Sequence, residues 1–338
     1  MPAAPKVSVL IPTYRFERYL AEAIESVLAQ DFGDFEVIVS DDASPDRSAE
    51  IARGYAARDS RIRVERHGTN IGMVANWNWC LREARGEYCK YVFGDDCLVS
   101  REALGRMVAL LDKSPGTVMA ASSRLVIDDA SRPEEVWDDL RLPGIHEGID
   151  LIGRCLREDR NLIGEPSVVL FRRAAAARGF DPALRQVVDL EMWFHLLLGG
   201  DLAYDPEPLC GFRRHAAQQT VVNRSAHVGP VESLRIADRY LGVLAARSHL
   251  GALALRSICF RTLYYSRKRS PRLPEIEAME GALASRLSPG WRCSLLVAHR
   301  LSKPFSNLGR ALRRLRDRLS PPPAPALAAE RLRWTPPR

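Results

Sequence analysis

Two strand-like runs of this sequence each end on a pair of aspartates. The run FEVIVS leads into Asp41 and Asp42, and the run YCKYVF leads, after one glycine, into Asp95 and Asp96. In an open α/β sheet, ligands bind beyond the carboxyl ends of the strands. Carboxylates gathered there can hold a divalent cation together with polar groups of a ligand. A nucleotide diphosphate carried with its cation is therefore a candidate ligand.

The first strand–turn–helix segment lacks two common nucleotide-binding signatures. Residues 6–11 (KVSVLI) have the pattern of a buried strand, Pro12, Thr13 and Tyr14 follow as a turn, and apolar residues then recur at helical spacing. A dinucleotide-binding turn would carry G-x-G-x-x-G, and a P-loop would carry G-x-x-x-x-G-K. Because the turn from Pro12 to Arg18 contains no glycine, the sequence argues against both classes.

The elements that must position these residues alternate between strand and helix over the first part of the chain. We expect strands at 6–11, 35–40, 61–65, 88–93 and 117–121, and helices at 17–30, 46–58, 71–84 and 101–112. This alternation predicts a mostly parallel central sheet flanked by helices. Residues 128–148 lose periodicity and are polar with Pro and Gly, so we expect a surface loop there.

Further elements follow from residue 161 onward. A short strand is expected at 168–171, a helix opened by Arg172 and Arg173, and another helix that begins at Asp189. Strand-like pieces follow at 202–204 and 209–215. These segments extend the α/β pattern.

At this point the residues resemble a known family. The stretches VSVLIPTYRFERYLAEAIESVLAQDFGDFEVIVSDDAS, DSRIRV and NIGMVANWNWCLREARGEYCKYVFGDD are similar to the inverting family 2 glycosyltransferases of the GT-A fold. The resemblance implies a hexosyltransferase-type enzyme that moves a sugar from a nucleotide diphosphate sugar, such as a UDP- or dTDP-sugar, with inversion of configuration. Its acceptor would be a glycan or lipid-linked glycan in cell-surface polysaccharide biosynthesis.

The resemblance also suggests a division of the chain into domains. Residues 1–224 would form the GT-A catalytic domain, in which 1–121 bind the nucleotide sugar and 161–220 contact the acceptor and supply the base. Residues 225–320 would form a helical basic C-terminal extension, followed by a disordered tail at 321–338.

Neutralising the departing diphosphate is the first chemical need of such a transfer, and a divalent cation meets it as a Lewis acid. Mg²⁺ and Mn²⁺ prefer oxygen ligands and use one or two protein carboxylates plus phosphate oxygens. By resemblance, Asp96 is the metal ligand, and Asp95 contacts the donor sugar or ribose. His215, which follows Arg213 and Arg214, could join the metal shell or be structural, and the two arginines could grip the diphosphate.

Nucleotide recognition falls on the ends of the first two strands. By resemblance, Asp42 accepts a hydrogen bond from the nucleotide base, and a uracil or thymine offers one ring N–H for this purpose. Asp41 would assist, and Thr13 and Tyr14, after Pro12, sit where base and ribose pack. The alternative is that the two aspartates only cap the following turn.

Deprotonating the acceptor hydroxyl is the second chemical need. By resemblance, Asp189 is the general base, which would give inversion without a covalent intermediate. The alternative is an acidic residue favoured by the dipole at a helix N-terminus. Glu191 is the fallback base, and Glu165 is a candidate acceptor contact.

Charge is distributed unevenly along the chain. The formal net charge is +7, but residues 231–338 hold 21 Lys and Arg against 7 Asp and Glu, so the part before them is acidic. A basic tail implies an anionic partner, either a membrane or nucleic acid. The leucines at 308, 312, 315 and 319 share one helical stripe surrounded by arginines, which favours a helix on an anionic membrane surface or one docked on the catalytic domain.

Cysteine usage and hydropathy bear on the compartment. The 7 cysteines are scattered without a C-x-x-C and are expected to be buried thiols of a reducing compartment. No basic-then-apolar leader opens the sequence, and no window approaches the ~18 uninterrupted apolar residues that a membrane-spanning helix needs. We therefore expect a cytoplasmic protein, peripheral on the inner face of the plasma membrane.

Two other classes of protein deserve comparison. A sugar nucleotidyltransferase also uses an α/β sheet and metal-bound acids, but it normally opens with a glycine-rich loop, which is missing here. A nucleic-acid-binding protein would explain the basic tail, yet no recognisable binding module accompanies it. We therefore expect no nucleic acid partner.

Overall fold

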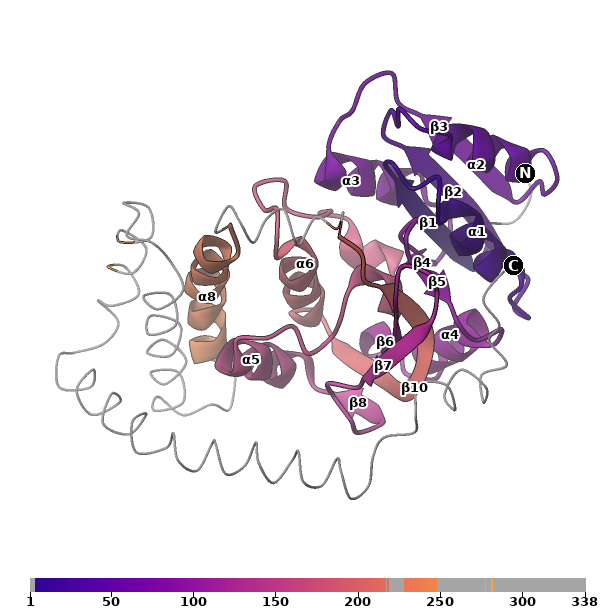
Figure 1. The fold of residues 1–338 in the computed structure, drawn as a ribbon. Helices are drawn as coiled ribbons and strands as arrows, with labels where there is room; N and C mark the ends of the chain where they lie inside the picture. Colours follow the sequence, from indigo (N-terminus) through magenta and orange to yellow (C-terminus); the bar gives the residue numbers. More distant parts are fainter. Residues whose placement is uncertain (1–3, 217, 219–227, 248–276, 278–280, 282–338) are drawn as a thin grey trace. The chain divides into compact units, whose positions relative to one another are not determined.

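The fold is seen in a computed structural model that describes residues 4–216, 218, 228–247, 277 and 281 (Figure 1). The α-helices of these residues are α1 (Leu20–Leu28), α2 (Ser48–Ala56), α3 (Met73–Glu83), α4 (Ala103–Lys113), α5 (Gly148–Glu158), α6 (Val188–Leu197) and α8 (Val228–Arg247). The strands are β1 (Val7–Thr13), β2 (Phe35–Asp41), β3 (Ile62–Arg66), β4 (Tyr88–Tyr91), β5 (Cys97–Leu98), β6 (Thr117–Ile127), β7 (Pro133–Trp137), β8 (Gly144–His146), β9 (Val169–Arg172) and β10 (Asp201–Arg213). Two 3-10 turns, η1 (Pro166–Val168) and η2 (Arg173–Ala176), flank β9.

The strands form a ten-stranded sheet in the order β3-β2-β1-β4-β9-β6-β10-β5, with β7 beside β6 and β8 beside β10. Strands β3, β2, β1 and β4 are parallel to one another. Strand β9 is antiparallel to both β4 and β6, whereas β6 and β10 are parallel. The predicted α/β fold is confirmed, with a parallel first half of the sheet and a mixed second half.

The order of the first four strands creates a switch point between β1 and β4. The chain moves outward from β1 to β2 and β3, and it then returns to the other side of β1 to form β4. Because such crossovers are right-handed, this reversal places α3 on the face opposite α1 and α2 (Figure 1). Ligands of open α/β sheets bind at such a point, beyond the carboxyl ends of the strands.

Apolar patterning explains why these elements form. Every residue of β1 and of β2 is buried, as expected for central strands covered by helices on both faces. Helix α1 buries Leu20, Ala23, Ile24 and Val27, which share one face at helical spacing. These layers hold the ends of β1, β2 and β4 at one edge of the sheet.

Gly94 allows the loop after β4 to pass close to the turn after β1. A Cβ atom at this position would lie 2.8 Å from Cδ2 of Phe16 and 3.2 Å from Oγ1 of Thr13. A side chain would therefore push the two loops apart. The glycine brings the acidic pair that follows it against the β1 end.

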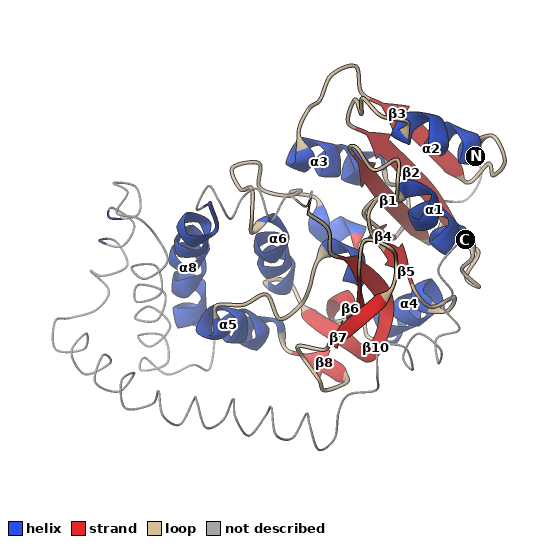
Figure 2. Cartoon of the chain, viewed as in Figure 1, coloured by secondary structure: helices blue, strands red, loops and turns tan. Residues whose placement is uncertain are grey.

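The expectation of a surface loop over residues 128–148 is wrong. This segment contains β7, antiparallel to β6, and β8, antiparallel to β10 (Figure 2). Val136 of β7 packs on a buried apolar group, and this contact secures the strand although its sequence is mostly polar. Local periodicity is weak here because no residue of β7 is fully buried, so neither face of the strand has to be apolar.

Two smaller expectations also need correction. The helix predicted to open at Arg172 and Arg173 is only the 3-10 turn η2, and the two strand-like pieces at 202–204 and 209–215 belong to one strand, β10. The pairing of β10 with β6 shifts register between Asp205 and Pro208, where the proline lacks an N–H for the ladder. The other predicted strands and helices are confirmed to within about three residues, except that β6, predicted at 117–121, extends to Ile127.

The described chain separates into two units. The first comprises residues 4–148 and 162–218, and the second comprises 149–161 with the described residues from 228 onward. Helix α8 of the second unit buries apolar residues at helical spacing, among them Leu234, Ala237, Leu241 and Leu244. The leucine-striped helix and the tail at 321–338 lie outside the described residues, and the domain boundaries remain predictions.

Five cysteines, Cys80, Cys89, Cys97, Cys155 and Cys210, are buried free thiols, as expected. Burial raises the pKa of Cys80 and of Cys89 to about 12. Cys259 and Cys293 lie outside the described residues. Among the helices that the structure describes, none is both long and apolar enough to cross a membrane.

Candidate functional site

The carboxyl ends of β1, β2 and β4 meet at the switch point and bring together most of the residues expected to bind a nucleotide. Pro12 and Thr13 at the end of β1 are buried, whereas Tyr14 is 38% exposed. The guanidinium of Arg15 lies 5.1 Å from the centre of the Tyr14 ring. Tyr14 therefore presents the accessible aromatic surface of this turn.

Asp42 ties the end of β2 to the turn that precedes α3. Its Oδ1 accepts a hydrogen bond from the N–H of Ile71 at 2.6 Å, and its Oδ2 accepts one from the N–H of Gly72 at 2.9 Å. The side-chain amide of Asn70 donates to the Asp42 carbonyl at 3.1 Å. Each carboxylate oxygen has a second lone pair, so these bonds orient Asp42 and leave acceptor capacity for a nucleobase N–H.

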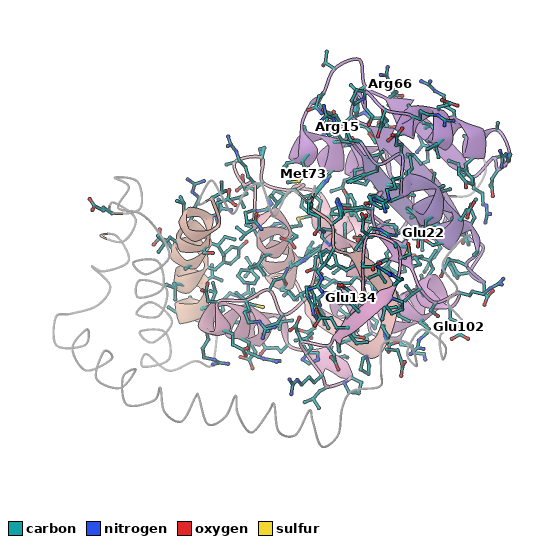
Figure 3. The ribbon with its side chains drawn as sticks, in the orientation of Figure 1. Arg15, Glu22, Arg66, Met73, Glu102 and Glu134 are labelled. Carbon is teal, nitrogen blue, oxygen red and sulfur yellow. The ribbon has the colours of Figure 1, made fainter. Side chains whose placement is uncertain are left out.

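Asp41 caps the turn that follows β2, which is the alternative considered from the sequence. Its side chain is buried, and Oδ2 accepts from the N–H of Ser44 at 3.1 Å and lies 3.4 Å from Nε of Arg66. Its Oδ1 is buried without a hydrogen-bond partner among the described residues. Arg15, Arg66 and Met73 come from three segments around this end of the sheet (Figure 3).

The acidic pair after β4 is held by residues more than seventy positions away. Asp96 is 2% exposed; its Oδ1 accepts from the backbone N–H of Arg213 at 3.0 Å and its Oδ2 from Oγ of Ser167 at 2.5 Å. Oδ2 of Asp95 lies 3.0 Å from Nε2 of His215. Burial, together with the neighbouring charge of Asp95, raises the pKa of Asp96 well above its ordinary value.

Arg213 does not take the diphosphate-gripping position that the sequence suggested. Its buried guanidinium donates to Glu22 at 2.6 Å, to the carbonyl of Asp95 at 2.7 Å and to Oγ of Ser131 at 2.8 Å. It also lies 4.7 Å from the centre of the Tyr19 ring. The N–H groups of Arg213 are therefore bonded to acceptors within the protein, and one of these bonds holds the loop that carries Asp95.

Arg214 follows the last residue of β10 and has different partners from Arg213. Its guanidinium pairs with Glu134 at 2.5 Å and with Glu135 at 3.1 Å, both on β7. Glu22 and Glu134, the carboxylate partners of the two arginines, come from α1 and β7 (Figure 3). The structure thus assigns both arginines to ion pairs within the protein.

His215 lies beside the acidic pair, as the sequence predicted. Its ring packs against Tyr19, with the ring centres 5.3 Å apart, and its side chain is 6% exposed. Since Nε2 faces Asp95, the histidine is at once a partner of that carboxylate and a neighbour of Asp96. A role as metal ligand stays a prediction.

The residues at the end of β4 suit a cation whose coordination shell is completed by a bound ligand. Within the part of the chain that the structure describes, no group of three or more His, Cys, Asp and Glu side chains could hold a metal ion by itself. One or two carboxylates at a strand end, here Asp95 and Asp96, are the donor set with which proteins hold Mg²⁺ together with phosphate oxygens. A cation here would therefore depend on a phosphate-bearing ligand.

Glu165, which directly precedes η1, belongs to a second cluster of charged side chains. Its Oε2 lies 2.7 Å from Nε of Arg124, whose Nη2 lies 3.2 Å from Oδ2 of Asp139. The Glu165 side chain is 26% exposed. The indole N–H of Trp193 donates to the Gly164 carbonyl at 2.9 Å and fixes the start of this turn. Glu165 is thus oriented and still accessible for an acceptor contact.

Asp189 and Glu191 take different environments although only one residue separates them. Asp189 is in the first turn of α6 and is partly exposed. Glu191 is fully buried, with its two oxygens 2.9 Å and 2.5 Å from the guanidinium of Arg178. Both oxygens of Glu191 are thus buried and paired with Arg178, which favours Asp189 over Glu191 as the base; the assignment of the base stays a prediction.

Breaking the Arg178–Glu191 ion pair is expected to lower stability without lowering catalytic turnover. Replacing Glu191 with glutamine should lower the free energy of unfolding by about 2 kcal/mol, the scale of hydrogen bonds to charged groups. Urea denaturation of the variant measures this change. The turnover of the folded variant should stay within about threefold of wild type, because glutamine keeps the shape of a buried side chain that is held by Arg178; a collapse of turnover at full stability would contradict the structural assignment.

The sequence interpretation missed Ser167 and Lys90. Ser167 gave no local signal, because its contact with Asp96 spans 71 positions. Lys90 does give a local signal, since a lysine interrupts the otherwise apolar and aromatic run YCKYVF.

Comparison with known proteins places this geometry in context. The family described as Glycosyl transferase family 2 matches residues 8–178. EpsE of Bacillus subtilis (strain 168) is 39% identical over 147 residues, which are 43% of this chain and 52% of EpsE. The chain thus spans about half the length of that relative.

Two solved structures share the fold. A segment of S. aureus TarS in complex with UDP-GlcNAc has a TM-score of 0.64 at 20% identity, covering 85% of this chain and 82% of that one. The mannosyltransferase PcManGT of Pyrobaculum calidifontis, in complex with GDP-Man and Mn²⁺, has a TM-score of 0.54 at 19% identity, covering 90% and 88%. At these identities the likeness concerns the fold alone.

Proposed function

Because the chain belongs to glycosyl transferase family 2, we propose that this glycosyltransferase moves a sugar from a nucleotide diphosphate sugar to an acceptor hydroxyl with inversion at the anomeric carbon. The observation that carries the proposal is the placement of Asp42 after β2 and of Asp95 and Asp96 after β4, the two strands that flank β1 at the switch point. This edge offers an acceptor for a nucleobase N–H and carboxylates for a cation. It therefore suits the two ends of one nucleotide diphosphate.

The donor assignment rests on hydrogen-bonding capacity. Asp42 is oriented by two backbone N–H groups and keeps lone pairs for the ring N–H of a uracil or thymine base. Tyr14 would pack on the base or ribose, and Asp95 would contact ribose or sugar. The solved relatives bind UDP-GlcNAc in one case and GDP-Man with Mn²⁺ in the other. We assign a UDP- or dTDP-sugar to this chain.

In the proposed mechanism, Asp96 is the protein ligand of Mg²⁺ or Mn²⁺, with His215 and Asp95 beside it. The cation, when bound with the donor, supplies neutralisation of the departing diphosphate. Asp189 accepts the proton of the acceptor hydroxyl as that oxygen attacks the anomeric carbon from the side opposite the leaving group. Glu165 contacts the acceptor. Transfer in one displacement yields the inverted anomer.

The charge of the C-terminal sequence bears on the acceptor and on where the enzyme acts. We assign a glycan or lipid-linked glycan of the cell surface, with the enzyme peripheral on the inner face of the plasma membrane. The support is the strongly basic sequence from residue 231 onward, which suits an anionic bilayer.

A panel of nucleotide sugars tests the donor and the cation together. We expect purified full-length protein to hydrolyse one uridine or thymidine diphosphate sugar, with activity restored by Mg²⁺ or Mn²⁺ after removal of metal by EDTA. NMR of the released sugar reports the anomeric configuration. Hydrolysis that persists in excess EDTA, or a product of retained configuration, would overturn the mechanism.

A further inference from the structure

Lys90 is a charged side chain in the centre of the sheet. It lies on β4, and its side chain is fully buried. Its Nζ donates to the carbonyl of Ser167 and lies 3.5 Å from Sγ of Cys210. Among the ion pairs of the described residues, none involves Lys90. Lysine is almost never fully buried without a charged partner, so its presence here needs a reason other than packing.

The cost of this burial is visible in the ionisation of the lysine. Burial lowers the pKa of Lys90, because a low-dielectric interior disfavours the charged form. Replacing buried charges with apolar residues of similar volume is often neutral or stabilising. A lysine that serves only to fill the core would therefore be a poor choice at this position.

Ser167, the acceptor of the Lys90 hydrogen bond, is bonded on three sides. Its carbonyl accepts from Lys90, its Oγ accepts from the N–H of Phe93 at 3.1 Å, and its hydroxyl donates to Oδ2 of Asp96 at 2.5 Å. Ser167 itself is 1% exposed. The 3-10 turn η1 that carries Ser167 is thus bonded to Lys90 on β4 and to Phe93 in the segment that leads from β4 to Asp96.

These bonds fix the carboxylate of Asp96 from two directions. Ser167 holds Oδ2, and the N–H of Arg213 holds Oδ1 at 3.0 Å. Two donors on different oxygens define the plane of a carboxylate, while each oxygen retains a lone pair. Partners that orient a ligating carboxylate in this way tune metal affinity.

We propose that Ser167 and Lys90 are positioning residues that hold Asp96 ready for a divalent cation, Ser167 by direct contact and Lys90 through the Ser167 carbonyl. The inference rests on the proposed function, since it assigns Asp96 to the cation. It adds to that function a series of hydrogen bonds in which Lys90 positions Ser167 and Ser167 positions Asp96. The same turn carries Glu165, so Lys90 also fixes the acceptor-side turn against the donor-side carboxylate.

Binding of Mn²⁺ to the full-length protein tests the chain of contacts without relying on turnover. The free-Mn²⁺ EPR signal is titrated in the presence of UDP and, separately, of GDP. Ser167→Ala removes the hydroxyl and should weaken Mn²⁺ binding by about 10- to 100-fold, the usual effect of losing such a partner. Lys90→Met keeps the length of the side chain and should weaken binding by about tenfold, the low end of that range.

The matched control is Ser123→Ala. Ser123 is also a fully buried serine, and its Oγ donates to the Pro206 carbonyl at 2.7 Å, so the variant loses one buried hydroxyl bond away from Asp96. It should bind Mn²⁺ within about twofold of wild type, because distant sites act independently. Its melting temperature also calibrates the stability lost with one buried hydroxyl.

The double variant Lys90→Met/Ser167→Ala separates a relay from two independent effects. If Lys90 acts through Ser167, the double variant should bind Mn²⁺ as weakly as Ser167→Ala alone, since coupled residues are not additive. Losses that multiply would overturn the relay. If Lys90→Met melts at a lower temperature than the Ser123→Ala control, and its loss of Mn²⁺ affinity is no larger than this loss of stability accounts for, the role of the lysine is structural. If Lys90→Met does not fold, Lys90→Gln repeats the test.

The outcomes also distinguish this inference from the function beneath it. Wild-type protein that binds no Mn²⁺ with either nucleotide would overturn the proposed function and the inference together. Wild-type binding with unchanged affinity in Ser167→Ala would overturn the inference and leave the proposed function standing.

Discussion

Replacing Asp96 with asparagine is expected to lower kcat for sugar transfer by at least about 10³-fold, because a bound cation supplies several kcal/mol of charge stabilisation and each ~1.4 kcal/mol is a factor of ten. Asparagine keeps the shape of the side chain and one oxygen that can accept from Ser167 or Arg213. It removes the negative charge that attracts the cation. Steady-state kinetics over a range of Mn²⁺ concentrations measures the effect.

The fold of this variant should survive. Burial disfavours the charged form of Asp96 and raises the pKa of its carboxyl group. Removing the charge therefore also removes a desolvation penalty. We expect a melting temperature within a few degrees of wild type, which circular dichroism would report.

Asp205→Asn is the matched control for the charge change. Asp205 is also largely buried, and its carboxylate pairs with Arg106 at 2.7 Å on another part of the sheet. This variant should lose stability through the broken pair and keep its turnover. Near-wild-type activity in Asp96→Asn, or an equal loss in both variants, would refute the role of Asp96 in cation binding.

The sequence was informative wherever a pattern is local. The runs FEVIVS and YCKYVF are largely apolar or aromatic stretches of the kind that forms central strands, and the ends of these runs predicted that Asp41, Asp42, Asp95 and Asp96 lie at one sheet edge. The missing glycine in the turn after β1 excluded two nucleotide-binding classes by the same local reasoning.

The partners of these residues could not be predicted in this way. Ser167 reaches Asp96 because β9 inserts between β4 and β6, and Arg213 reaches Asp95 because β10 lies beyond β6. Both contacts depend on strand order, which hydrophobic periodicity does not encode. The polar segment of β7 was missed for a related reason, since it is secured by its neighbour β6 rather than by its own pattern.

Two pairs of candidate residues have a geometry that the sequence itself implies. Arg213 and Arg214 are adjacent in a strand-like segment, so alternation sends them to opposite faces, and one cannot share the other's ligand. Asp189 and Glu191 are two positions apart on a helix, a spacing that does not place side chains on one face. The two acids are therefore alternatives, since both cannot face one substrate from this helix.

That spacing makes Asp189 the sharper subject of a kinetic test. Asp189→Asn keeps the size of the side chain but cannot accept a proton, so kcat should fall by about 10² or more, the usual contribution of a general base. The binding of the donor nucleotide should stay close to wild type, because the proposed nucleotide contacts are all on residues 12–96 and 215. Isothermal titration with UDP alongside single-turnover kinetics measures both quantities on the same preparation.

Glu191→Gln is the natural comparison, since it makes the same chemical change two positions along the same helix. A base at position 189 and a structural carboxylate at position 191 predict different phenotypes. Asp189→Asn should lose turnover, whereas Glu191→Gln should lose stability through Arg178 and keep its turnover. If Asp189→Asn instead weakens UDP binding as much as it slows transfer, Asp189 belongs to the nucleotide site. The acceptor proton must then leave through another group on the acceptor side, for which Glu165 is the accessible carboxylate.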